Sequence, residues 1–121
     1  MNYDDDNIFA KILRGEIPCD KIYEDDFVLS FYDINPQKKI HALVIPKGKY
    51  IDLDDFNTNA SDKEIIGLMK GITTVSKKLG ISSIDGKGYR ALANISDYGG
   101  QEVPHLHFHL FGGEKIGKMV S

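Results

Sequence analysis

Histidine and apolar residues alternate without a break over residues 105–110, and this alternation constrains the fold more than any other feature of the sequence. The six positions are His105, Leu106, His107, Phe108, His109 and Leu110. Successive side chains of a β-strand point to opposite faces of its sheet, so the pattern predicts a strand over residues 104–111 with one histidine face. We expect the apolar face to pack against a helix and the histidine face to line a polar cleft or meet solvent.

Three interpretations of the histidine face are open at this point. It can be ordinary polar alternation, although the whole chain holds only four histidines. It can be a metal site, because imidazole is a common zinc ligand, although no Asp, Glu or Cys lies in the same strand. It can also be a site of phosphoryl chemistry, because a neutral imidazole is a good nucleophile near pH 7.

Composition narrows the class of protein. A chain of 121 residues is predicted to form a single domain, 1–121, and its net charge of −3 argues against general nucleic-acid binding. Its one cysteine excludes an internal disulfide and fits a reducing compartment. No apolar run approaches the length of a membrane span, and the acidic N-terminus is unlike a secretory signal, so we expect a cytoplasmic protein.

The order of the predicted elements favours an α+β fold with a mostly antiparallel sheet of five strands. They are a short helix over residues 7–14, strands over 21–24, 27–33 and 41–46, a long helix from Ser61 to Gly80, and strands over 89–94 and 104–111. The acidic segment 52–59 is predicted to be a loop without regular structure. Residues 1–6 and 114–121 are predicted to be flexible tails.

The long helix carries two local signals. Ser61 and Glu64 have the spacing of a capping box, in which each side chain binds the other residue's backbone N–H. Gly67 and Gly71 lie inside this helix, where each costs about 1 kcal/mol relative to alanine, so we expect a close packing contact at both.

The histidine strand matches the His-x-His-x-His-x-x signature of the histidine triad (HIT) superfamily, with an apolar residue at each x. Residues 31–36 and 41–46 resemble the central block of that family, residues 8–12 its opening helix and residues 89–103 its approach to the triad. The chain is most similar to the Hint-type (protein kinase C inhibitor-like) branch, whose members are purine nucleoside phosphoramidases and nucleotidyl hydrolases. The resemblance implies a HIT-like fold.

The same resemblance implies roles for all four histidines. His107 takes the place of the nucleophile, which attacks the α-phosphorus of a nucleoside monophosphate derivative and forms a nucleotidyl-histidine intermediate. The backbone carbonyl of His105 takes the place of the acceptor that holds the second nitrogen of this ring. His109 corresponds to the residue that contacts the phosphate, and His41 to the family histidine beside the triad.

The resemblance also implies the residues that hold the nucleotide. Asn94 and Gln101 match positions that hydrogen-bond the phosphate and the bridging atom, and backbone amides of the Gly99–Gly100 turn approach the anion. Asp33 matches the residue that grips the ribose hydroxyls, although a turn-capping role is an alternative. The implied apolar slot for the base consists of Ile8, Phe9, Ile12, Phe31, Ile34 and Leu43, of which Phe31 and Leu43 can equally be core residues.

Three features depart from the Hint pattern or stay unassigned. Glu102 stands where relatives have a small hydroxyl residue, and a carboxylate there repels a phosphate unless it is protonated or turned away; the role of neighbouring Val103 is also uncertain. The last residues, 113–121, lack the Trp-Pro-Pro-Gly-like ending of relatives, which leaves substrate specificity open. Cys19 alone cannot form the Cys-x-x-Cys zinc element of some bacterial members, and we expect it to be a half-buried small residue.

The resemblance implies a homodimeric hydrolase that acts on a purine nucleoside monophosphate conjugate and releases AMP or GMP. No metal or other cofactor is expected to be required. Two alternatives stay within nucleotide binding: a dinucleoside polyphosphate hydrolase, and a regulatory protein with weak catalysis. The third alternative is a metal-binding protein.

Overall fold

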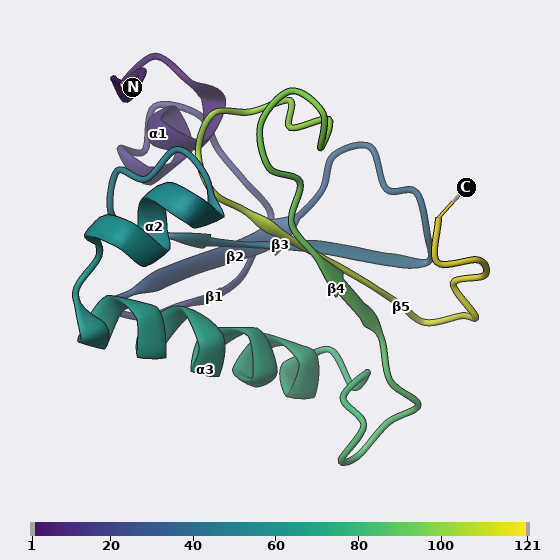
Figure 1. Cartoon of the computed structure of the whole chain (residues 1–121). Helices are drawn as coiled ribbons and strands as arrows, with labels where there is room; N and C mark the ends of the chain where they lie inside the picture. Colours follow the sequence, from purple (N-terminus) through teal and green to yellow (C-terminus); the bar gives the residue numbers. More distant parts are fainter. Residues whose placement is uncertain (1, 121) are drawn as a thin grey trace.

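The computed structural model describes residues 2–120, so Met1 and Ser121 of the two predicted tails lie outside the described residues. Its helices and strands follow one another as α1 (Ile8–Leu13), β1 (Lys21–Glu24), β2 (Val28–Tyr32), β3 (Ile40–Pro46), α2 (Leu53–Asn59), α3 (Asp62–Lys78), β4 (Arg90–Leu92) and β5 (Phe108–Gly112). The strands form one antiparallel sheet in the order β1-β2-β3-β5-β4 (Figure 1). The predicted α+β class and five-stranded antiparallel sheet are confirmed.

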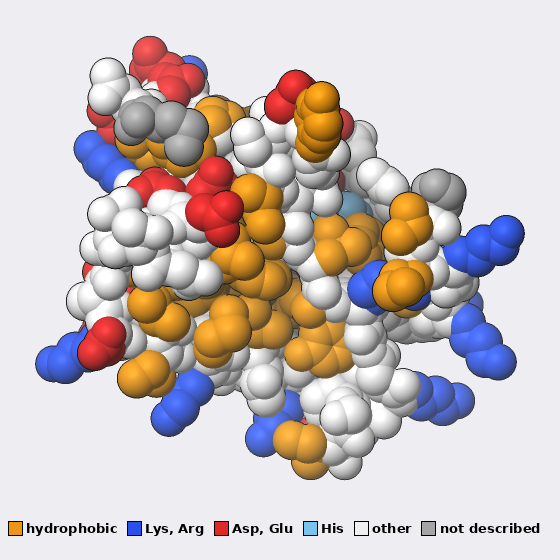
Figure 2. Space-filling model, viewed as in Figure 1, with side chains coloured by type: hydrophobic (Ala, Val, Ile, Leu, Met, Phe, Trp, Pro, Cys, Tyr) orange, Lys and Arg blue, Asp and Glu red, His pale blue; other side chains and the backbone are white. Residues whose placement is uncertain are grey.

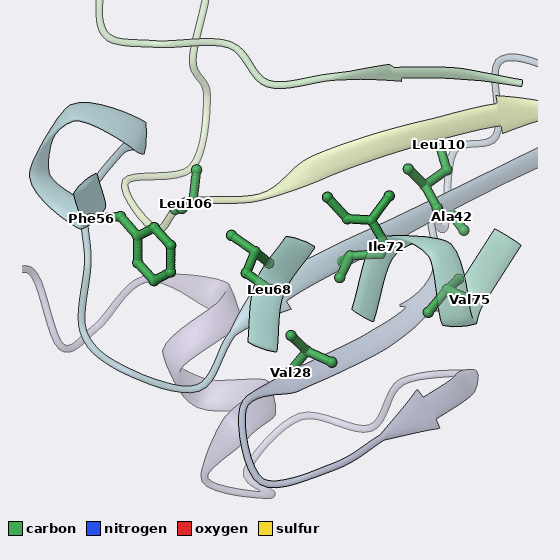
Figure 3. Close-up of a cluster of buried hydrophobic side chains, with 9 residues drawn as sticks. Val28, Ala42, Phe56, Leu68, Ile72, Val75, Leu106 and Leu110 are labelled. Carbon is green, nitrogen blue, oxygen red and sulfur yellow. The ribbon is translucent and has the colours of Figure 1, made fainter. Parts of the chain in front are cut away.

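The sheet is covered on both faces. Alternate residues of β2 and β3 divide between two apolar clusters, because side chains alternate along a strand. Val28, Ala42 and Val44 pack with Leu68, Ile72 and Val75 of α3 and with Leu110 (Figure 3). On the other face Leu29, Phe31, Leu43 and Ile45 pack with Phe9 of α1, and Cys19 is half-buried against them as predicted.

Both predictions about the long helix are confirmed. Ser61 and Glu64 form the full capping box at the start of α3. A Cβ atom at Gly67 would lie 2.5 Å from Cγ of Phe27, and one at Gly71 would lie 3.0 Å from Cγ2 of Val28. The two glycines therefore let α3 approach β2 and the turn before it in the same chain.

The prediction of an irregular loop over residues 52–59 is wrong. Helix α2 occupies Leu53–Asn59, with Asp52 as its N-cap accepting a hydrogen bond from the backbone N–H of Asp55 at 2.8 Å. Acidic residues in the first turn favour a helix start because they face its positive end. The sequence hides this helix because Phe56 is its only buried residue, which leaves no apolar period to detect.

The last strand is shorter than the predicted span of 104–111. It begins at Phe108, because the backbone N–H groups of two residues earlier in the predicted span bind loops instead of a neighbouring strand. His105 N–H donates to the Val103 carbonyl, and Leu106 N–H donates to the Tyr50 carbonyl, both at 2.9 Å. Strand β4 is also shorter than its predicted span of 89–94.

The described parts of both predicted tails contact the domain. Lys49 forms an ion pair of 2.8 Å with Asp5 in the N-terminal segment. At the other end, Glu114 accepts a hydrogen bond of 2.7 Å from Lys39 N–H, and Arg90 donates to the carbonyls of Gly117 and Lys118. Within residues 2–120, none of the helices is long and apolar enough to cross a membrane.

Candidate active site

The histidines gather on the sheet face that carries α1. His109 pairs with Leu43 and His41 with Phe111 in the register of β3 and β5, so both rings share the face of the second apolar cluster. The rings of His107 and His109 lie 5.0 Å apart between centroids, and those of His41 and His109 5.2 Å apart. The strand alternation thus brings His41 beside the triad.

This face is more enclosed than the sequence suggests. His105, His107 and His41 are 0%, 6% and 2% exposed, whereas a face that lines a polar cleft or meets solvent was expected. The ring of Phe9 in α1 stands edge-on to His107 at 4.9 Å, and Tyr3 stands edge-on to His105 at 5.6 Å. The N-terminal segment therefore covers the first two histidines, and the third, half-buried, borders the open side.

The tautomer of His107 is determined by its backbone neighbour. Its Nδ1 lies 2.7 Å from the carbonyl oxygen of His105, so Nδ1 carries the proton and donates it. Nε2 is then unprotonated and carries a free lone pair. Burial lowers the pKa of His107, although the His105 carbonyl and the charges of Asp33 and Glu102 oppose this shift, so the ring is neutral near pH 7.

His105 is held at both ring nitrogens. Nε2 lies 2.8 Å from the carbonyl of Pro46 and must donate to it, which leaves Nδ1 as an acceptor. The hydroxyl of Tyr3 lies 2.6 Å from this Nδ1 and donates to it. Burial lowers the pKa of His105 to about 4.

A short relay determines the tautomers of the remaining pair. The backbone N–H of Gln37 donates to Nδ1 of His41 at 3.2 Å, so the proton of neutral His41 sits on Nε2. That group donates to Nδ1 of His109 at 2.9 Å, which places the proton of His109 on its own Nε2. Burial, followed by the nearby His107 and His41, lowers the pKa of His109 to about 4.

The result is a lone pair on His107 and an N–H on His109 in neighbouring rings. A lone pair on an imidazole can attack phosphorus, and an adjacent N–H can stabilise the charge on its oxygens. Sequence reasoning missed the groups that set this up outside the triad, namely the Gln37 amide, the Pro46 carbonyl and the Tyr3 hydroxyl. The Pro46 carbonyl and the Tyr3 hydroxyl meet His105 only through the tertiary fold. The Gln37 amide is four residues from His41, but a backbone N–H leaves no signal in the sequence, because every residue except proline supplies one.

The residues expected to hold the nucleoside lie beside the histidines, over β2 and β3. Asp33 Oδ2 lies 3.4 Å from Nε2 of His41, and its Oδ1 accepts the N–H of Asn35, so it also caps the turn. In the expected apolar slot, Phe9, Phe31 and Leu43 are buried, Ile12 is half-buried, and Ile8 and Ile34 are exposed. The three buried side chains belong to the second apolar cluster, so they serve as core residues of this face.

The loop before the triad is closed on itself. The side-chain amide of Gln101 donates to the carbonyls of Ile51 and Val103, and its oxygen accepts the N–H of Ser96. Gly100, at a φ of +74°, donates its N–H to Asp97. Contacts of Gln101 and Gly100 with a phosphate would thus require these bonds to open.

The other residues of this region differ in exposure. Glu102 is exposed, whereas Val103 is half-buried against the second apolar cluster. Asn94 borders a cleft of about 560 Å³ together with His109. The residues that line this cleft also include Lys38, Arg90, Lys118 and Met119, and none of its lining residues is acidic.

Among residues 2–120, Asp33, His41 and His109 are the group with ligand atoms close enough to hold a metal ion, within 4.8 Å of one another. The tautomer of His41 disfavours metal binding by this group. A histidine that binds a metal usually donates its other N–H to an acceptor, whereas Nδ1 of His41 faces the N–H of Gln37. Nε2 of His41 would have to lose its proton while Nδ1 faced a donor.

Residues 14–116 match the HIT domain family. The chain belongs to this family. A HIT-like protein of Azospirillum brasilense is 49% identical over 119 residues, which cover 98% of this chain and 95% of the relative. The purine nucleoside phosphoramidase of Escherichia coli K12 is 40% identical over 117 residues, covering 97% and 95% of the two chains.

Solved structures agree with this HIT fold. A histidine triad protein from Clostridium difficile has a TM-score of 0.81 at 40% identity, with 98% of each chain covered. A HIT family hydrolase from Clostridium thermocellum has a TM-score of 0.85 at 35% identity, covering 98% of this chain and 99% of that one.

Proposed function

We propose that this HIT protein is a hydrolase that cleaves purine nucleoside 5′-phosphoramidates or related nucleotidyl conjugates through His107. The observation that carries the proposal is the hydrogen bond of 2.7 Å between His107 Nδ1 and the His105 carbonyl. It leaves Nε2 unprotonated in a neutral ring, which is the form that can attack phosphorus. A relative named purine nucleoside phosphoramidase and a structural neighbour named a HIT family hydrolase support it.

The reaction proceeds in two displacements. Nε2 of His107 forms a bond to the α-phosphorus as the P–N or P–O bond breaks, and the leaving group takes up a proton from solvent water as it departs. Water then attacks the same phosphorus, the imidazole leaves, and the proton of water is released with the nucleoside monophosphate. The N–H of His109 donates to a phosphoryl oxygen in both steps. The neighbouring pair thus needs no metal or other cofactor.

The strand order β2-β3-β5-β4 orients the substrate across the sheet. The nucleoside lies over β2 and β3, where Asp33, Ile34 and the second apolar cluster are found. The phosphate lies over His107 and His109, where β5 begins. The leaving group then extends over β4, into the cleft bordered by Asn94 and Arg90.

A second candidate is hydrolysis of dinucleoside polyphosphates. One observation favours it: Lys38, Arg90 and Lys118 border the leaving-group cleft, whose lining has no acidic residue, in a chain of net charge −3. Figure 2 shows Lys and Arg side chains on the side of the molecule near the C-terminus. Such a cleft suits a leaving group that carries phosphates.

The test is AMP release from adenosine 5′-phosphoramidate, measured beside a diadenosine polyphosphate. We expect steady turnover that falls by at least about 1000-fold in His107→Ala. AMP binding without turnover of either compound would instead support a regulatory protein. Stoichiometric zinc on the purified chain, with activity lost on chelation, would support the metal-binding alternative and contradict the proposed mechanism.

We also propose that the protein is a homodimer. Ile66 and Met69 of α3 are 52% and 46% exposed, and Figure 2 shows a broad apolar area between α2 and α3 and over the adjoining sheet. Strand β4 stands at an edge of the sheet and leaves one row of backbone groups unpaired, which a second copy can extend. Light scattering should give twice the chain mass, and Met69→Glu should lower it.

A further inference from the structure

Tyr3 lies more than a hundred residues from the triad in the sequence, yet it makes the shortest hydrogen bond to any triad ring. Its hydroxyl donates to Nδ1 of His105 at 2.6 Å. His105 is 0% exposed, so this nitrogen has no access to solvent. The geometry points to Tyr3 as a positioning residue of the active site, an inference that rests on the function proposed above.

The His105 ring is clamped from two sides. The Pro46 carbonyl at the end of β3 accepts from Nε2 at 2.8 Å, and the Tyr3 hydroxyl donates to Nδ1. A ring held at both nitrogens has one orientation and one tautomer. The backbone carbonyl of the same residue accepts the His107 proton, so a His105 side chain fixed at both ends also restrains the backbone that carries this acceptor.

Several contacts hold the segment that directly follows Tyr3. The carbonyl of Asp4 accepts from the backbone and side-chain amides of Asn7, at 3.2 and 2.7 Å. The carbonyl of Asp5 accepts from Arg14 at 2.8 Å, and its carboxylate pairs with Lys49 at the same distance. Lys49 follows β3 closely, so one region of the fold anchors both the N-terminal segment and the acceptor of His105.

Loss of the Tyr3 hydroxyl is expected to change kcat and KM differently. Tyr3→Phe keeps the ring that packs on His105 but leaves Nδ1 of a buried histidine without a donor. The His105 side chain is then less restrained, and the backbone carbonyl of His105 holds the His107 proton less well. Because Tyr3 is not one of the proposed substrate-binding residues, kcat should fall by about ten-fold while KM stays within about two-fold.

The matched control is Tyr23→Phe. Tyr23 is also half-buried and donates its hydroxyl to a side chain, Asp25, at 2.8 Å, but it lies on β1 at the far edge of the sheet. This variant loses a similar bond and should keep the kcat of the original protein. Thermal unfolding of both variants reports any general loss of stability.

A second measurement does not need turnover. Nuclear magnetic resonance of the free protein can follow the His107 Nδ1 proton, whose exchange with water is slow while His105 holds it. We expect this exchange to be at least about five-fold faster in Tyr3→Phe and unchanged in Tyr23→Phe. Unchanged exchange and unchanged kcat in Tyr3→Phe would overturn the inference. If the original protein turns over no nucleotide conjugate, the proposed function fails, and the exchange rate still decides the role of Tyr3.

Discussion

The imidazole rings of His41 and His109 share one hydrogen bond, from Nε2 of His41 to Nδ1 of His109 at 2.9 Å. The Gln37 N–H on the far side of His41 gives this bond a direction. One backbone amide therefore decides where His109 carries its proton, two rings away, and presents an N–H beside the nucleophile.

Replacing His41 by Phe should lower kcat by at least about ten-fold. The substitution keeps a buried ring but removes the donor to His109 Nδ1, so His109 no longer has a defined tautomer. The measurement is steady-state AMP release, with the His109 tautomer followed by nitrogen chemical shifts. An unchanged tautomer and rate would show that the relay has no part in catalysis.

The protein should lose stability as the pH falls from 6.5 to 4. The folded-state pKa of His105 is about 4 against an ordinary value of 6.5, and burial is the cause. In that window the unfolded chain binds the proton and the folded chain does not, so the free energy of unfolding falls with pH, by at most about 1.4 kcal/mol per unit for this one group.

His109, His107 and His41 shift in the same direction. Glu24, whose pKa is lowered to about 2 by Lys47 and Lys21, acts mainly below pH 4.5 and so can be separated. Urea unfolding at several pH values measures the slope, which should be shallower in His105→Asn. A slope that persists unchanged in that variant would assign it to other groups.

Gly67→Ala should destabilise the protein by about 1–2 kcal/mol. The added Cβ would lie 2.5 Å from Cγ and 2.6 Å from Cβ of Phe27, and the Phe27 Cβ cannot move without its backbone. Overpacking therefore exceeds the helix-propensity gain of about 1 kcal/mol. Thr73→Ala, at an exposed site of the same helix, is the control and should be neutral or slightly stabilising. A gain in Gly67→Ala equal to the control would show that Phe27 yields without cost.

Arg90→Lys should raise KM for a diadenosine polyphosphate by several-fold and leave kcat close to that of the original protein. The guanidinium donates to two carbonyls, of Gly117 at 3.0 Å and Lys118 at 2.8 Å, which an ammonium cannot match with the same fork. The C-terminal segment that borders the cleft would then be less well held. Lys77→Ala on the exposed side of α3 serves as the control, and equal KM values in the two variants would rule out this role.

Periodic features of the chain were predictable because their causes are local. Alternation along a strand predicts that Leu106 and Leu110 lie in the core and that the histidines lie on the opposite face. The spacing of Ser61 and Glu64 predicts the start of α3. Helix α2 was not predicted, because a single buried phenylalanine produces no helical periodicity of apolar residues. The late start of the last strand was not predicted, because the backbone N–H groups of His105 and Leu106 find their partners in loops.

The sequence by itself determined which residues can do chemistry: four histidines, three of them at positions that a strand must place on one face. The family resemblance already implied that the His105 carbonyl holds the proton of His107. Only the tertiary structure decided which nitrogen of His41, His105 and His109 carries the proton, because the deciding groups are the Gln37 amide and the Pro46 carbonyl. It also decided that the histidine face is covered, by a segment from the far end of the chain. A tautomer depends on hydrogen-bond partners within about 3 Å. The His105 carbonyl and the Gln37 amide lie two and four residues from the rings they meet, whereas the Pro46 carbonyl and the pairing of His41 with His109 come together only when the sheet has formed.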